Sequence, residues 1–144
     1  MRCNEDVLTD AGFLRVRNSA LFRNGAGVDV LSPGMDRNTT GTFWFDVRAV
    51  NLARIDDSAR AWLLIRIVPA SFALLPLREF LPLLTADAER EGSDATPVFS
   101  FVCDVDESAG IVRIESRTAR AGAVSTPLLD RDRAVEGVHG IAAD

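Results

Sequence analysis

The segment Thr42 to Val50, TFWFDVRAV, constrains the fold of this chain more than any other. Successive side chains of a strand point to opposite faces, and here that alternation separates an apolar face from a more polar one. The two faces consist of Phe43, Phe45, Val47 and Ala49 on one side and Trp44, Asp46, Arg48 and Val50 on the other. Aromatic and β-branched residues dominate the segment, which favours a strand. The sequence therefore predicts a strand that carries Asp46 and Arg48 as neighbours.

Other segments predict the rest of a sheet around this strand. Residues 61–68 form a nearly continuous apolar run that only Arg66 interrupts, and an apolar segment at 71–75 follows. Further strands are expected at the following ranges: 13–17, 28–31, 98–105 and 111–115. Residues 42–75 are thus expected to form the centre of one sheet.

Two helices are expected beside the sheet. The first covers 4–11, with Asn4 as N-cap and Gly12 as its stop. The second begins at Pro76 and runs toward residue 84, where Pro82 is expected to shorten or kink it. The expected fold class is α+β: a central mixed β-sheet of about five to seven strands, flanked by an N-terminal helix and a helix near 76–84.

The apolar pattern also sets the expected domain organisation. A chain of 144 residues suits one domain with one hydrophobic core. The pattern is strong over residues 1–116, which are expected to form that domain, and it weakens from Arg117 onward. Residues 117–144 are expected to be a loosely packed tail or an isolated short helix.

Composition excludes several chemistries and locations. All 16 basic residues are arginine, so lysine catalysis is excluded, and one histidine, His139, leaves little material for a zinc site or a histidine triad. Cys3 and Cys103 form no closely spaced pair, and both are expected to be reduced thiols. No run approaches the ~20 apolar residues of a membrane span, and the N-terminus lacks a signal-peptide pattern. A cytoplasmic protein without a membrane partner is expected.

One constellation has catalytic character. Asp29 lies in the apolar strand expected at 28–31, and Asp46 lies in the next expected strand with Arg48 two residues later. If these two strands pair, their carboxylates come together, and two carboxylates can hold Mg²⁺, which prefers oxygen ligands. A cation beside them can stabilise developing phosphate charge.

The order of these residues resembles the PD-(D/E)xK nuclease superfamily, the restriction-endonuclease-like domains. The resemblance covers roughly residues 4–84 and depends on four features: Glu5 on the first helix, Gly12-Phe13 after it, Gly27-Val28-Asp29-Val30, and Phe45-Asp46-Val47-Arg48. It implies a catalytic set of Asp29, Asp46, Arg48 and Glu5, with Asp29 and Asp46 as Mg²⁺ ligands. Arg48 stands where the family has lysine. Arginine keeps its charge at any ordinary pH, so it can stabilise an anion but cannot act as a general base.

Two functions follow as expectations. One is a nuclease-like domain of a prokaryotic nucleic-acid-processing or defence system that hydrolyses phosphodiesters with Mg²⁺. The alternative is a catalytically inactive module that binds or inhibits a protein, suggested by the replaced lysine and the net charge of −5, which disfavours tight non-specific binding to nucleic acid. Asp29 and Asp46 also fit ordinary strand positions, with Arg48 as a surface ion-pair partner.

The partner classes that remain open are nucleic acid, another protein, and a second copy of the chain. Trp44 and Trp62 suit stacking on bases or on a partner, and equally suit a core. Arg113, Arg117 and Arg120 suit a nucleic-acid groove, although their acidic neighbours indicate a mixed surface.

Overall fold

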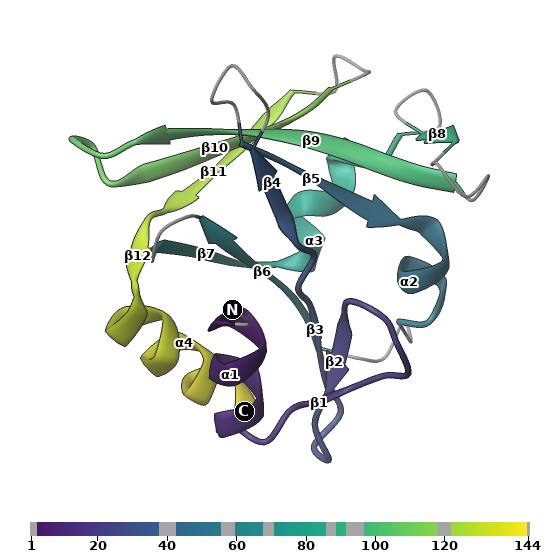
Figure 1. Cartoon of the computed structure of the whole chain (residues 1–144), viewed down its shortest axis with the longest axis vertical. Coiled ribbons are helices and arrows are strands. Elements are labelled where there is room, and N and C mark those ends of the chain that lie inside the picture. Colours follow the sequence, from purple (N-terminus) through teal and green to yellow (C-terminus); the bar gives the residue numbers. More distant parts are fainter. Residues whose placement is uncertain are drawn as a thin grey trace.

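The computed structural model shows a fold of three layers (Figure 1). It describes residues 3–37, 43–55, 60–67, 71–85, 89–91, 97–117 and 122–143. One sheet, here sheet B, packs on a second sheet, sheet A, and two helices cover the other face of sheet A. The expected α+β class with a mixed sheet and flanking helices is confirmed.

Sheet A is the mixed sheet. Its strands in spatial order are β1 (Leu14–Arg15), β2 (Leu21–Arg23), β3 (Val28–Leu31), β6 (Arg60–Ile67), β7 (Ser71–Pro76) and β12 (Leu129–Asp130). Neighbours are antiparallel except β3 and β6, which are parallel with Asp29 opposite Ala61. Strands β3 and β6 are largely apolar on both faces, since sheet B lies over one face and helices lie over the other.

Sheet B is antiparallel in all its described pairings. Its strands in spatial order are β11 (Ala123–Pro127), β10 (Ile111–Ser116), β9 (Pro97–Asp106), β5 (Phe43–Arg48) and β4 (Met35–Arg37), with β8 (Glu89–Glu91) also paired to β9. Phe45 and Val47 of β5 face sheet A and are buried. The alternation predicted for this strand is thus confirmed over Phe43–Arg48, and Trp44, Asp46 and Arg48 lie on the outer face of the sheet. The prediction is wrong for Ala49 and Val50, which lie in a helix.

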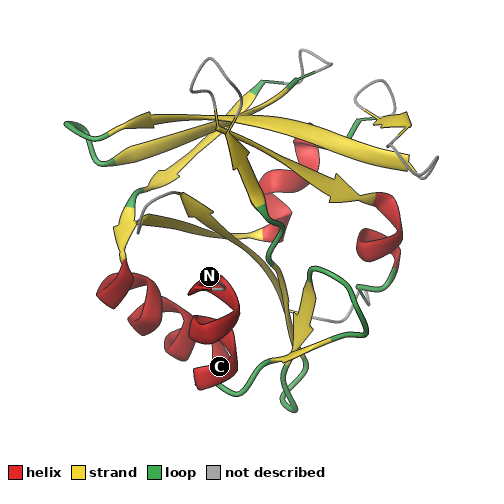
Figure 2. Ribbon diagram, in the orientation of Figure 1, coloured by secondary structure: helices red, strands yellow, loops and turns green. Residues whose placement is uncertain are grey.

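The helices lie in two places relative to the sheets. Helices α1 (Cys3–Asp10) and α4 (Arg131–Ala143) lie together on sheet A, on the face away from sheet B (Figure 2). Helix α3 (Leu77–Phe80) and a 3-10 turn at Leu81–Leu83 pack between the sheets. The expected effect of Pro82 is confirmed, since the α-helix stops after four residues. Helix α2 (Ala49–Ala53), which the sequence reading missed, continues directly from β5.

The expectation of one sheet centred on 42–75 is wrong in one respect. Strands β6 and β7 form the middle of sheet A, whereas β5 belongs to sheet B. The partner of β5 is β9, where Phe45 lies opposite Phe101. That pairing joins residues far apart in the sequence, so no local pattern indicates it.

The expected loose tail also needs correction. Residues 123–130 add β11 to sheet B and β12 to sheet A, and helix α4 follows. Three residues of α4 are buried against sheet A and helix α1, namely Ala134, Val138 and Ile141. They recur at helical spacing of three or four, which makes the helix amphipathic despite its weak overall apolar pattern. The C-terminal segment is therefore part of both sheets and of the helical layer.

Two glycines of α4 allow a matched test of how closely it lies on sheet A. A Cβ at Gly137 would approach the Leu74 Cδ2 atom of β7 to 2.9 Å, whereas a Cβ at Gly140 would meet nothing within 4 Å. Alanine is favoured over glycine by about 1 kcal/mol in a helix interior, so Gly140→Ala should raise the free energy of unfolding by up to that amount. Gly137→Ala should raise it less or lower it, because Leu74 must move. Equal gains in urea denaturation would contradict the close docking of α4.

None of the helices within the described ranges is long and apolar enough to span a membrane.

Candidate functional site

Asp29 is the buried member of the predicted catalytic set. It lies in the middle of sheet A on β3, and its side chain is only 2% exposed. Arg23, opposite it on β2, holds the carboxylate with two hydrogen bonds: Nε donates to Oδ1 at 2.7 Å and Nη2 donates to Oδ2 at 3.1 Å. Such a paired fork is the strongest arrangement between an arginine and a carboxylate. Both carboxylate oxygens are therefore engaged by a cation of this chain.

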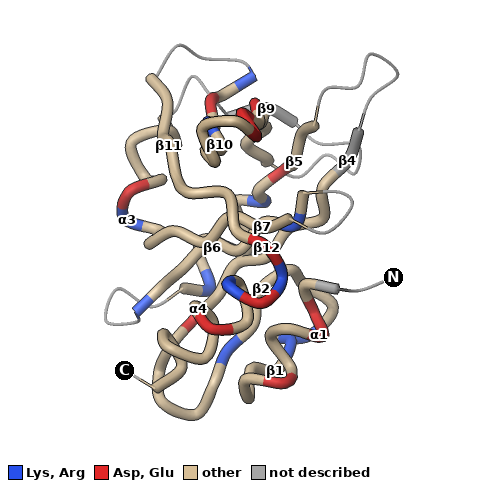
Figure 3. Tube along the Cα trace, turned by 90° about the vertical axis from the view of Figure 1, so that its left-hand side faces the viewer, with Lys and Arg blue, Asp and Glu red and all other residues tan. Residues whose placement is uncertain are grey.

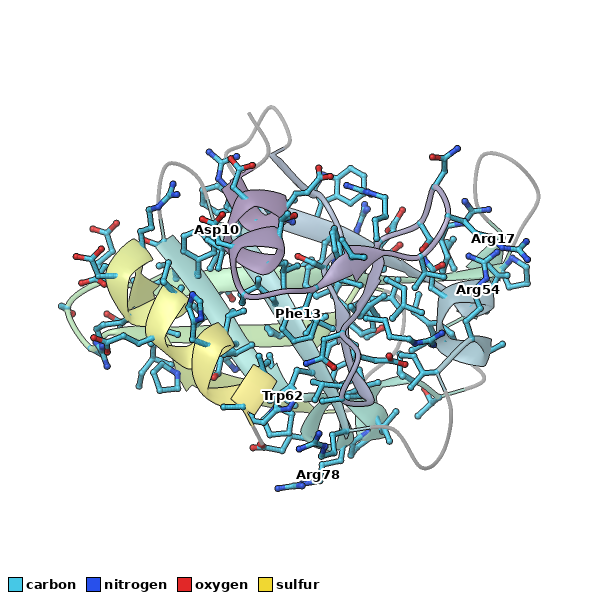
Figure 4. The ribbon with its side chains drawn as sticks, turned by 90° about the horizontal axis from the view of Figure 1, so that it is seen from below. Asp10, Phe13, Arg17, Arg54, Trp62 and Arg78 are labelled. Carbon is cyan, nitrogen blue, oxygen red and sulfur yellow. The ribbon has the colours of Figure 1, made fainter. Side chains whose placement is uncertain are left out.

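The same arginine connects sheet A to helix α2. Arg23 Nη2 also donates to the backbone carbonyl of Arg54 at 3.0 Å, at the C-terminal end of α2. Figure 4 shows Arg54 and Arg17 on the same side of the molecule, where the β1–β2 loop lies near the end of α2. Asp29 thus anchors an arginine that joins two parts of the fold.

Asp46 lies in a different environment on sheet B. It is half-buried on the outer face of β5, and its Oδ1 accepts a hydrogen bond from Ser100 Oγ at 2.5 Å. Ser100 is directly opposite on β9. Arg48, two residues along, is exposed on the same face. Asp46 and Arg48 are therefore neighbours on one face of the strand, as predicted.

The strand pairing assumed for the catalytic set does not occur. Strand β3, which carries Asp29, pairs with β2 and β6 in sheet A, whereas β5, which carries Asp46, pairs with β4 and β9 in sheet B. Glu5 lies on α1 and forms an ion pair with Arg15 of β1 at 2.9 Å. The structure places these carboxylates in three separate settings, each with a hydrogen-bond or ion-pair partner from this chain.

The Mg²⁺ expectation has no matching cluster in the described part of the chain. Over those residues, no group of three or more His, Cys, Asp or Glu side chains could hold a metal ion. Asp29 already accepts two hydrogen bonds from Arg23, and a divalent cation at the same oxygens would lie against a guanidinium. Metal binding by Asp29 and Asp46 stays a prediction.

The outer face of sheet B is the second candidate for the functional site. It faces away from sheet A and from helices α1, α3 and α4 (Figure 1). The register of β5, β9 and β10 defines its members, which we call the outer face: Trp44, Asp46, Arg48, Val98, Ser100, Val102, Asp104, Asp106, Ile111, Arg113, Glu115 and Arg117. Half-buried Trp44 and Val102 are direct cross-strand neighbours. Charged residues lie on both sides of them, so the face has an apolar centre with a polar rim.

The rim contains defined interactions. The Arg117 guanidinium lies over the Trp44 ring, 5.2 Å from its centroid, which is a cation–π contact. Arg113 Nη1 lies 2.8 Å from Glu115 Oε2, and both side chains are substantially exposed. Positive and negative residues are interspersed along the trace rather than segregated, as Figure 3 shows. The outer face is therefore a mixed-charge surface around one aromatic ring.

Sequence reasoning missed Arg23 and the grouping of the outer face for different reasons. The turn Asn24-Gly25-Ala26-Gly27 was a usable signal for Arg23, because a hairpin around it places Arg23 opposite Asp29. No local signal places Trp44 beside Val102, since that contact requires β5 to pair with a strand more than fifty residues away. Trp62, by contrast, packs against the core between sheet A and the helices.

Cys103 gives a pH-dependent prediction. Burial, with a smaller contribution from Asp104, raises the pKa of the Cys103 thiol from 9.0 to about 12. Between these values the unfolded chain releases the proton and the folded chain keeps it, so the free energy of unfolding should fall as pH rises, by up to about 1.4 kcal/mol per pH unit. The chain has no lysine and no tyrosine, so Cys3 is the only other side chain that titrates in this window.

Urea denaturation at several pH values between 9 and 12 measures this slope. Cys103→Ala should flatten it. An unchanged slope in Cys103→Ala would show that the buried thiol is not its source.

Comparisons with known proteins provide no identification. No family model matches the chain, and no curated protein or solved structure matches it.

Proposed function

We propose that this chain is a non-catalytic protein-interaction module that binds its partner on the outer face of sheet B. The observation that supports it is the apolar pair Trp44 and Val102 within a rim of charged residues. Interface residues that dominate binding are enriched in Trp and Arg and lie centrally, with polar residues around them. Trp44 and Arg117 match that description on a rigid antiparallel sheet.

The charge of the surface favours a protein over nucleic acid. The outer face has three arginines and four acidic residues, namely Arg48, Arg113 and Arg117 against Asp46, Asp104, Asp106 and Glu115. Affinity for a phosphate backbone comes mainly from uncompensated positive charge, and the chain as a whole carries −5. A mixed surface instead suits a partner that presents both signs, where the pattern of charges sets the specificity.

The positions of Asp29 and Asp46 also favour binding over hydrolysis. A nuclease of the suggested type needs both carboxylates at one metal, and here Asp29 is engaged by Arg23 while Asp46 lies in the other sheet. We therefore expect no cleavage of plasmid or branched DNA, or of RNA, with Mg²⁺ or Mn²⁺. Metal-dependent cleavage that Asp46→Ala abolishes would overturn the proposal in favour of a nuclease.

The binding role is tested with affinity-tagged chains in a lysate of the organism that encodes the protein. Wild type should retain a defined set of proteins, which can include untagged copies of this chain, and Trp44→Ala or Arg117→Ala should lose them. Arg78→Ala, an exposed arginine on α3 outside this surface, should retain them. Identical sets from all four proteins would overturn the assignment of the outer face.

A further inference from the structure

The side chain of Asn24 connects the β2–β3 hairpin to the C-terminal end of α4. Its Oδ1 accepts hydrogen bonds from the backbone N–H of Ala26 at 3.1 Å and from that of Val28 at 2.9 Å. Its Nδ2 donates to the backbone carbonyl of Ala142 at 3.4 Å, near the end of α4 (Figure 1). The last four carbonyls of a helix have no partner within the helix. The Asn24 amide therefore supplies a donor to one of them and ties α4 to the hairpin.

Glycine follows Asn24, and the fold does not require glycine at that position. A Cβ at Gly25 would meet nothing within 4 Å, and its φ lies outside the left-handed region, unlike that of Gly27 at +82°. The missing side chain matters for chemistry instead, because it leaves the Gly25 backbone nitrogen free to approach the preceding amide. The chain has four other asparagines, and a larger residue follows each of them: Asn4, Asn18, Asn38 and Asn51.

We propose that Asn24 is a site of spontaneous deamidation, which the native fold suppresses and which weakens the attachment of α4 once it has occurred. In this reaction the Gly25 backbone nitrogen forms a bond to Asn24 Cγ. The Cγ–Nδ2 bond breaks, and the amide nitrogen leaves as ammonia with the proton of the Gly25 N–H. Water then opens the resulting succinimide ring to aspartate or isoaspartate. The net reaction consumes one water and releases one ammonia, so it needs no enzyme, oxidant or cofactor.

The hydrogen bonds of Asn24 explain the suppression in the folded chain. In the unfolded chain the side-chain amide rotates freely and reaches the geometry in which the Gly25 nitrogen attacks Cγ. In the folded chain three hydrogen bonds, two to Oδ1 and one from Nδ2, hold the plane of the amide in one orientation. These bonds must open before the reaction, so the rate falls by the free-energy cost of opening them.

The product of deamidation changes the contact with α4. A carboxylate at position 24 can still accept hydrogen bonds from Ala26 and Val28, but it has no N–H to donate to Ala142. Its negative charge also lies at the C-terminal end of α4, where the helix dipole is negative. Deamidation therefore replaces an attractive contact by a repulsive one.

The wild-type chain provides the first test. It is incubated at mildly alkaline pH with and without denaturing urea and is then digested with trypsin. The tryptic peptide 24–37 contains Asn24 and no other asparagine, so mass spectrometry of this peptide measures the conversion directly. In urea Asn24 should react faster than the other asparagines, and in the folded chain it should react at least about tenfold more slowly than in urea. Equal rates in the two states, or no reaction in urea, would overturn the proposal.

Gly25→Ala tests the attacking residue. The added Cβ meets no atom within 4 Å, so the variant should fold as wild type does, and it should lose most of the reaction in urea because the Cβ hinders the attack. A variant that reacts as fast as wild type would rule out attack by the Gly25 nitrogen.

Asn24→Asp imitates the product and tests the attachment of α4. Hydrogen exchange of the α4 amides should be faster by roughly fivefold or more, since a hydrogen bond is lost and a charge opposes the helix dipole. Asn18→Asp makes the same change at an exposed residue between β1 and β2 and should leave the exchange of α4 unchanged. Should Asn24→Asp fail to fold, Asn24→Ala, which also lacks the donor, should change the exchange in the same direction. Unchanged exchange at position 24 variants would overturn the attachment of α4 through Asn24.

Discussion

Replacing Arg23 by methionine should lower the free energy of unfolding by about 2–4 kcal/mol. The substitution keeps a long apolar side chain but leaves the Asp29 carboxylate, 2% exposed, without its two hydrogen bonds from the guanidinium. The loss should be below that for a fully buried pair, because the Arg23 side chain is 44% exposed and water can reach it. Urea denaturation followed by tryptophan fluorescence measures the change.

Arg113 provides the matched control. It also pairs with a carboxylate at 2.8 Å, but both side chains are exposed, so Arg113→Met should cost under about 1 kcal/mol. A double-mutant cycle with Asp29→Asn then isolates the coupling between Arg23 and Asp29. If Arg23→Met and Arg113→Met had equal effects, Asp29 would not depend on Arg23, and the case for its structural role would fail.

Phe101→Ala should cost about 3–5 kcal/mol, the range for removing a large buried aromatic side chain. Phe101 is fully buried between the sheets, with its ring centroid 5.3 Å from that of Phe45 and 4.5 Å from that of Phe80. These rings come from β9, β5 and α3, so the cavity would lie where both sheets and the helix meet. Thermal unfolding should show a correspondingly lower midpoint.

Two further variants calibrate this result. Phe101→Leu keeps most of the volume and should cost much less than the alanine substitution. Leu14→Ala removes a side chain that is 69% exposed and should change stability by no more than about 0.5 kcal/mol. A small effect of Phe101→Ala would mean that the packing between the two sheets is not the main core of the protein.

Local physical chemistry explains which elements could be predicted. The alternation in TFWFDVRAV, the apolar strand at 28–31 and the helix that Gly12 ends at φ +91° depend on neighbours within a few residues. The short strands β4 and β12 and helix α4 were missed or underestimated because their own apolar patterns are weak. They form where buried surface of another element is available, as Val138 of α4 shows on sheet A.

The candidate site likewise has one part that could be predicted from the sequence and one part that could not. That Asp46 and Arg48 share a face follows from the period of a strand, and the structure confirms it. Whether Asp29 lies near them depends on which strands pair. Backbone hydrogen bonds do not select the partner, because the edge of a strand offers the same donors and acceptors to any other strand. The apolar faces decided it: β5 buries Phe45 against Phe101 in sheet B, while β3 lies beside β6 in sheet A.

The sequence by itself therefore determined the α+β class, most strand and helix positions, and the two faces of β5. Only the tertiary structure decided that β5 and β3 belong to different sheets, that Arg23 engages Asp29, and that Trp44, Val102 and Arg117 gather on one surface. The physical reason is the range of the interactions. Side-chain alternation is set by adjacent residues, whereas sheet partners are selected by burying apolar area between segments far apart in the chain.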